Sequence, residues 1–207
     1  MASKLNRALS QTIKRQLASD RDLSIQTKQI IEKSFINIRR KMLIDFERHP
    51  VTKELSGGPG ASNATNTLVE GNLFGFIGFE SGKNPVQDIE TLLRKTDIII
   101  KRRQMGNKGF IWTYLVTSPS LKELYTVTPM PWANGSSWLR EFEGRGIPNL
   151  GQYMHKKIKT SRSGVGYQNK NKSQGGRLKI PYIKQLLIDF EKELNSIEAS
   201  RVSRANF

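Results

Sequence analysis

An alternating run from Phe110 to Thr117 is the feature that most constrains the fold of this chain. Its bulky residues Phe, Trp, Tyr and Val fall on one face, and Ile, Thr, Leu and Thr fall on the other, which is the period of a β-strand. The preceding apolar run, Ile98–Ile100, becomes basic at Lys101–Arg103, and the intervening Gly106-Asn-Lys-Gly109 tolerates the positive φ of a tight turn. These residues predict a β-hairpin with a basic tip.

The residues before this hairpin predict a strand and a helix. Leu73–Phe79 is a short apolar run, which we interpret as a strand. Asn84-Pro-Val-Gln87 has the signals of a helix start, because Asn can cap, Pro fits the first turn and Gln can reach back. The inward stripe of that helix would be Val86, Ile89, Leu92 and Leu93. The order strand, helix, hairpin predicts an α+β fold with an antiparallel sheet flanked by helices.

Apolar periodicity predicts further helices. They are a short basic helix over residues 3–18, a long helix from Ser24 to about Arg48 that His49-Pro50 ends, a short one over Ser136–Phe142, and a last one opened by Pro181. The long helix has the stripe Ile31, Phe35, Ile38, Met42 and Phe46. A short strand is predicted at Leu124–Val127. The expected organisation is a basic arm at 1–23, one body at 24–198 with long loops at 50–72 and 161–179, and a tail at 199–207.

The charge of the chain is strongly positive. Its 34 Lys and Arg against 18 Asp and Glu give a formal net charge of +16, which favours a polyanionic partner. Residues 144–188 contain ten basic residues and no acidic one. The basic residues that we expect to face DNA or acidic partners are Lys4, Arg7, Lys14, Arg15, Arg39, Arg40, Lys41, Lys101, Arg102, Arg103, Lys170 and Lys172. Such contact can be independent of nucleotide sequence, because phosphates carry no base information.

No catalytic apparatus can be assembled from the sequence. The chain has no cysteine, and His49 and His155 lack metal-ligand spacing, so His49 is interpreted as a helix-end cap and His155 as a solvated side chain. No phosphate-binding glycine motif and no nucleophile elbow occur. We therefore expect no enzyme activity, no catalytic residue, no cofactor and no metal. The sequence also lacks a signal-peptide pattern and an apolar run of about 20 residues, so no membrane contact is expected.

The order of several segments resembles that of the neck and tail-completion proteins of tailed bacteriophages. The segments are a basic helical N-terminal region, His49-Pro-Val-Thr-Lys-Glu54 followed by Gly-Pro-Gly-Ala-Ser-Asn63, Asn72-Leu-Phe-Gly-Phe-Ile-Gly-Phe79, and Trp138–Leu150 leading into Ser161–Gln168. The resemblance covers residues 25 to 197. It implies a non-enzymatic virion subunit, made in the host cytoplasm, that forms a sixfold or twelvefold ring around the DNA channel between head and tail.

The partners that the resemblance implies are further copies of the chain, neighbouring neck, connector and tail proteins, and packaged DNA. We expect one loop to reach a neighbouring subunit. This loop consists of Ser56, Gly57, Gly58, Pro59, Gly60, Ala61, Ser62 and Asn63. Two other functions stay open: a tail-terminator protein of the same particle, and a stand-alone basic nucleic-acid-binding protein. An enzyme of phosphoryl transfer would require acidic residues gathered around a metal.

Overall fold

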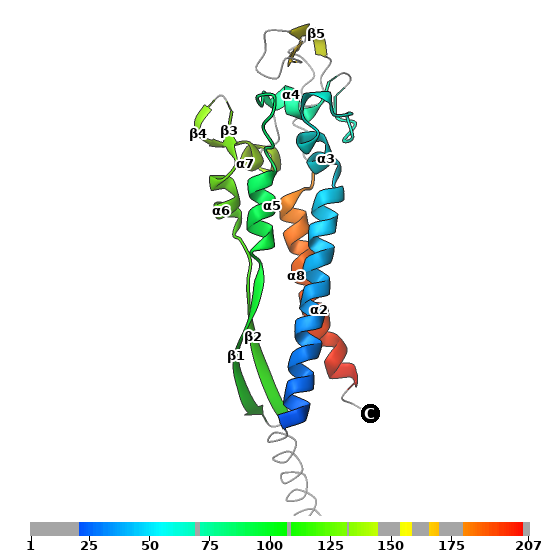
Figure 1. Cartoon of the computed structure of the whole chain (residues 1–207), viewed down its shortest axis with the longest axis vertical. Coiled ribbons are helices and arrows are strands. Elements are labelled where there is room, and N and C mark those ends of the chain that lie inside the picture. Colours follow the sequence, from blue (N-terminus) through cyan, green and yellow to red (C-terminus); the bar gives the residue numbers. More distant parts are fainter. Residues whose placement is uncertain are drawn as a thin grey trace, which may run out of the picture. The chain divides into compact units, whose positions relative to one another are not determined.

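The helices and strands of this chain are known from a computed structural model that describes residues 21–68, 71–106, 109–131, 133–144, 154–158, 166–169 and 180–204 (Figure 1). The α+β class predicted from the sequence is confirmed. The helices are α2 (Arg21–Arg48), α3 (Pro50–Ser56), the 3-10 turn η1 (Gly58–Gly60), α4 (Leu73–Ile77), α5 (Gln87–Arg94), α6 (Leu121–Thr126), α7 (Trp138–Glu143) and α8 (Ile183–Arg204). The strands are β1 (Asp97–Gly106), β2 (Gly109–Thr117), β3 (Pro129–Met130), β4 (Ala133–Ser137), β5 (Met154–Ile158) and β6 (Gly166–Asn169).

The described strands pair in sequence order as three separate antiparallel ladders of two strands each: β1 with β2, β3 with β4, and β5 with β6. The predicted hairpin is confirmed, since Gly106 pairs with Gly109 and Asp97 with Thr117. The register shifts between Ile100 and Arg102, which marks a bulge in β1. In the described end of β2, Tyr114 and Val116 are half-buried while Thr113, Leu115 and Thr117 are exposed, which agrees with the predicted alternation.

Internal contacts divide the chain into two compact units. Among the described residues, unit 1 holds 21–39 and 96–118, and unit 2 holds 40–95 and 119–204. In unit 1, Ile31 and Phe35 of α2 are buried, and the guanidinium of Arg39 donates to the backbone oxygen of Thr96 at 2.9 Å. The sequence analysis placed residues 24–198 in one body, whereas the contacts group the hairpin with the first part of α2.

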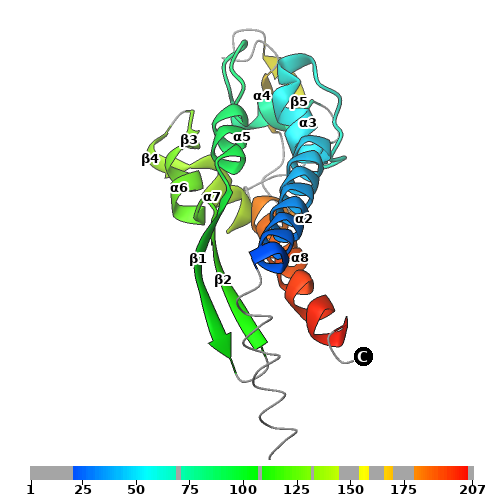
Figure 2. The ribbon, with the colours of Figure 1, turned by 60° about the horizontal axis from the view of Figure 1, so that its bottom comes forward.

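In unit 2, α8 lies beside the last turns of α2 (Figures 1 and 2), where Lys41 forms an ion pair with Glu193. Arg94 of α5 pairs with Glu47 of α2 at 3.0 Å. The predicted stripes are buried where expected, as Met42 and Phe46 on α2 and Ile89 and Leu93 on α5 are at most 3% exposed. Ile38 and Leu92, which complete the two stripes, are half-buried.

Two predicted strands are helices. Most of the run Leu73–Phe79 forms α4, because Asn72 caps the helix by accepting from the backbone nitrogen of Gly75 at 2.9 Å, and Gly78 ends it with φ 90°. Leu124–Val127 belongs to α6, whose capping box joins Ser120 and Glu123. Glu123 is held ionised there, since the hydrogen bonds from Ser120 lower its pKa.

Several predicted boundaries are also wrong. Residues 50–72 are not a loop without structure, because they contain α3 and η1. Asn84 does not cap α5: its side chain accepts from Val86 N at 3.3 Å within a turn, and the helix begins at Gln87. Ser24 lies inside α2 rather than at its start, and α8 continues to Arg204, into the predicted tail. The predicted helix at 3–18 lies outside the described residues.

Candidate functional site

A buried carboxyl group, Glu54, organises the loop that the sequence assigned to subunit contact. Its side chain is fully buried, and one oxygen, Oε1, accepts from the backbone nitrogen of Leu73 at 2.5 Å. The other, Oε2, accepts from the backbone nitrogen and the hydroxyl of Thr65 at 3.0 and 2.7 Å. One side chain thus joins α3 to the loop at Thr65 and to the first turn of α4.

Asn72 holds the other side of the same loop. Its amide nitrogen donates to the backbone oxygens of Gly58, Pro59 and Ala61 at 3.1, 3.2 and 2.9 Å. Asn63 adds an internal bridge, as its Oδ1 accepts from Thr67 N at 3.2 Å and its amide donates to the Leu68 oxygen. The loop is therefore fastened to its own subunit, and only part of it, Ser56, Gly57, Gly60 and Ser62, is exposed as a fixed outer surface.

Two polar contacts hold the ends of the neighbouring helices. Glu143, at the end of α7, accepts from the backbone nitrogen of Lys184 in the first turn of α8 at 2.6 Å. Burial raises the pKa of Glu143, although hydrogen bonds from Lys184 and Ile183 oppose that rise. His49 was predicted to cap the end of the long helix, but it caps the start of the next one: its Nδ1 accepts from Val51 N, in the first turn of α3, at 3.2 Å.

The His49 cap predicts a pH dependence of stability. Burial lowers the pKa of His49 below 6.5, so the unfolded chain takes up the proton first. The neutral His49 side chain should therefore make its full contribution to the free energy of unfolding above pH about 6.5. This contribution should decrease as the pH falls through the lowered pKa of His49 in the folded protein. We expect His49→Asn, which keeps a capping acceptor without a titrating ring, to lose less stability between about pH 7.5 and about pH 5.5 in urea unfolding. Equal losses in the two proteins would contradict this assignment.

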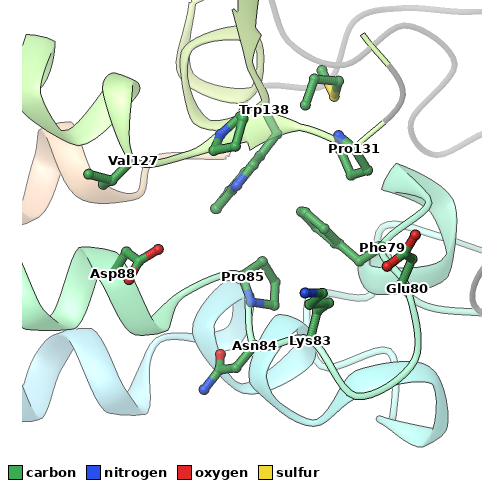
Figure 3. Close-up of a pocket in the computed structure, with 11 residues that line it drawn as sticks. Phe79, Glu80, Lys83, Asn84, Pro85, Asp88, Val127, Pro131 and Trp138 are labelled. Atoms are coloured by element: carbon green, nitrogen blue, oxygen red, sulfur yellow. The ribbon is translucent and has the colours of Figure 1, made fainter. Parts of the chain in front are cut away.

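A pocket of about 450 Å³ lies in unit 2 between the start of α5 and the α6–α7 region (Figure 3). Its apolar walls include Trp138 and Phe79, whose rings meet edge to face at 5.9 Å. Polar groups of Glu80, Lys83 and Asp88 also line it. Within the described residues, no group of three or more His, Asp or Glu side chains is placed to hold a metal ion. The pocket thus combines an aromatic wall with charged side chains on its rim.

Those predicted basic residues that the structure describes do not form one cluster. Arg39 donates a hydrogen bond to the backbone oxygen of Thr96, Lys41 forms an ion pair with Glu193, and the side chain of Arg40 is exposed. β1 carries the run Lys101–Arg103, with Arg102 opposite Thr113 and Arg103 opposite Trp112. The remaining six, Lys4, Arg7, Lys14, Arg15, Lys170 and Lys172, lie outside the described residues.

Unit 1 leaves large apolar side chains exposed. Ile30 of α2 is 56% exposed and Ile99 of β1 is 51% exposed. Ile25, Ile36 and Leu115 are each more than 40% exposed as well. The exposed isoleucines of α2 do not share one face, because the helix period places Ile30 well away from Ile25 and Ile36.

The sequence analysis missed Glu54, Asn72 and the pocket. A signal for Glu54 exists, because in a helix it shares the face of the buried Val51 and Leu55.

Comparison with protein-family models, with curated proteins and with solved structures finds no match to this chain. In the described part of the chain, no helix is long and apolar enough to cross a membrane.

Proposed function

We propose that this chain is a structural subunit of the neck of a tailed bacteriophage, a ring-forming protein that joins the head to the tail around the DNA channel. The observation that carries the proposal is the number of large apolar side chains that unit 1 leaves exposed on α2 and on the β1–β2 hairpin. A subunit of an assembly needs such a surface, because neighbouring copies or adjoining rings cover it.

The charge of the chain supports the same proposal. A net charge of +16 suits a protein beside packaged DNA or beside acidic partner rings. The order of segments resembles that of neck and tail-completion proteins, and this resemblance is the basis for proposing a position between head and tail. A tail-terminator role in the same particle would use the same properties.

The basic run Lys101–Arg103 and the acid-free segment 144–188 favour a second candidate, a stand-alone nucleic-acid-binding protein. Light scattering separates the two proposed functions. It measures the mass of the native species at low and at high salt, with and without duplex DNA. The neck proposal expects a ring-sized oligomer with weak affinity for free DNA. A monomer or dimer that binds free DNA tightly, with affinity falling steeply as salt rises, would replace the neck proposal with the second candidate.

Charge reversal on β1 tests whether its basic run faces DNA or acidic partners. We expect particles assembled with the Arg102→Glu, Arg103→Glu variant to form in lower yield or to retain less DNA, because each reversal removes a favourable contact and adds a repulsive one. The matched control is Lys122→Glu, Lys192→Glu, which changes the net charge equally at exposed helical positions of unit 2. Yield and DNA retention equal to those of the control would remove Arg102 and Arg103 from the proposed surface.

A further inference from the structure

The pair Asn134-Gly135 lies in an irregular part of the β3–β4 ladder. Pro129 pairs with Ser137 and Met130 pairs with Ala133, so residues 134–136 of β4 have no partner on β3. A bulge of this kind leaves its extra residues outside the ladder and bends the strand. The backbone at Asn134-Gly135 is therefore not held by the hydrogen bonds that fix a regular strand.

Both residues of this pair are open to solvent. Asn134 and Gly135 are exposed, and Gly135 has a φ of 78°, a conformation that residues with a side chain rarely adopt. Apart from its chain neighbours, no atom of the described residues lies within 4 Å of the position that a Cβ of Gly135 would occupy. The backbone nitrogen of Gly135 is thus accessible to the side chain before it and to water.

We propose that Asn134 is a site of spontaneous deamidation in the folded protein. The backbone nitrogen of Gly135 loses its proton to hydroxide and attacks Cγ of Asn134. The new bond closes a five-membered succinimide ring, and the bond from Cγ to Nδ2 breaks, so that the side-chain nitrogen leaves as ammonia.

Water then opens the ring at one of its two carbonyl carbons. Cleavage of the bond between nitrogen and Cγ gives aspartate, and cleavage of the bond between nitrogen and the main-chain carbonyl carbon gives isoaspartate, whose main chain runs through the side chain. The net reaction consumes one water and releases one ammonia. It requires no oxidant, no metal and no second enzyme, and it is independent of the proposed neck function.

Sequence and fold together distinguish Asn134 from the other asparagines. It is the asparagine that a glycine follows in this chain, and a glycine does not shield the attacking nitrogen because it has no Cβ. Asn72 is buried, and its amide donates to three carbonyl oxygens. Asn195 is exposed and precedes the small residue Ser196, but both lie inside α8, where helical hydrogen bonds hold the backbone.

Buried contacts close the base of the segment that contains Asn134. The backbone nitrogen of Trp138 donates to the Thr128 oxygen at 3.0 Å, and the hydroxyls of Thr128 and Ser137 lie 2.7 Å apart. The extra main-chain atom of isoaspartate would be taken up in the bulge, outside these contacts. The reaction should therefore replace a neutral amide with a carboxylate without unfolding unit 2.

Incubation of the full chain at mildly alkaline pH, followed by peptide mapping with mass spectrometry, tests the proposal. Asn195 serves as the comparison within the same sample. Asn134 should deamidate at least about tenfold faster than Asn195, because attack by Ser196 N first requires the helix to open. A methyltransferase specific for isoaspartate, used as a reagent, should label the peptide that contains residue 134. The rate should rise with pH, since the attacking nitrogen must lose its proton.

Two controls separate the site and the fold from general lability. Asn134→Gln should abolish the labelling and keep the fold, because ring closure from a glutamine needs one more atom and the position is exposed. In urea that unfolds the chain, Asn195 should react much faster than in the folded protein, whereas the rate at Asn134 should change by less than about tenfold. A folded-state rate at Asn134 no higher than that at Asn195, or a reaction at Asn134 that requires urea, would refute the proposal.

Discussion

Replacement of Glu54 with alanine should lower the free energy of unfolding by about 2–5 kcal/mol, because it leaves two backbone donors without a partner at about 1–3 kcal/mol each. The carboxyl group is fully buried and accepts three hydrogen bonds, from Leu73 N, Thr65 N and Thr65 Oγ1. Alanine would leave the backbone donors without a partner and open a cavity between α3 and the loop. Unfolding in urea, followed by circular dichroism, measures the loss.

Two variants make this prediction specific. Glu54→Gln keeps the volume, but its amide donates where Leu73 or Thr65 also donates, so it should lose a large part of the same stability. Lys53→Ala, at the exposed neighbouring position, should change stability by less than about 0.5 kcal/mol. If Glu54→Ala unfolds at the same urea concentration as Lys53→Ala, the carboxyl group does not organise this loop.

The polar network around Glu54 explains why the sequence predicted the wrong structure for residues 50–72. The glycine, serine and asparagine residues of this segment are typical of a loop without regular structure. In the structure the amide of Asn72 binds three carbonyl oxygens of that segment from 11 to 14 residues away. A contact between residues so far apart leaves no local periodicity, so no pattern in the sequence could have predicted which carbonyl meets which side chain.

The hairpin was predictable because its signals are local. Strict alternation over Phe110–Thr117 and a glycine on each side of the turn indicate a hairpin, although the register shift between Ile100 and Arg102 was not predicted. The run Leu73–Phe79 was too short for its period to separate a strand from a buried helix turn. Two residues decide for the helix: Asn72, which precedes the run and caps the helix, and Gly78, which ends the helix with a positive φ. Neither acts through hydrophobicity.

Tyr182 should be the second position with a large effect on stability. Its side chain is 2% exposed, and its ring lies 4.8 Å from that of His49 and 6.2 Å from those of Phe46 and Phe142. Its hydroxyl is 2.8 Å from the hydroxyl of Thr52 on α3. We expect Tyr182→Ala to cost about 3–5 kcal/mol, as for other large aromatic residues in a core, because one ring contacts α2, α7 and the cap of α3.

Tyr182→Phe separates the contribution of the ring to stability from that of the hydroxyl. It keeps the aromatic contacts and removes only the bond to Thr52, so it should cost about 1 kcal/mol in urea unfolding. Burial also raises the pKa of the Tyr182 phenol far above its usual value of 10.0, so at alkaline pH this phenol should ionise only as the protein unfolds. A spectrophotometric titration of the wild type against Tyr182→Phe tests this. A tyrosine that ionises near pH 10 in the folded wild type, and is missing from Tyr182→Phe, would show that the ring is not buried at the junction of these helices.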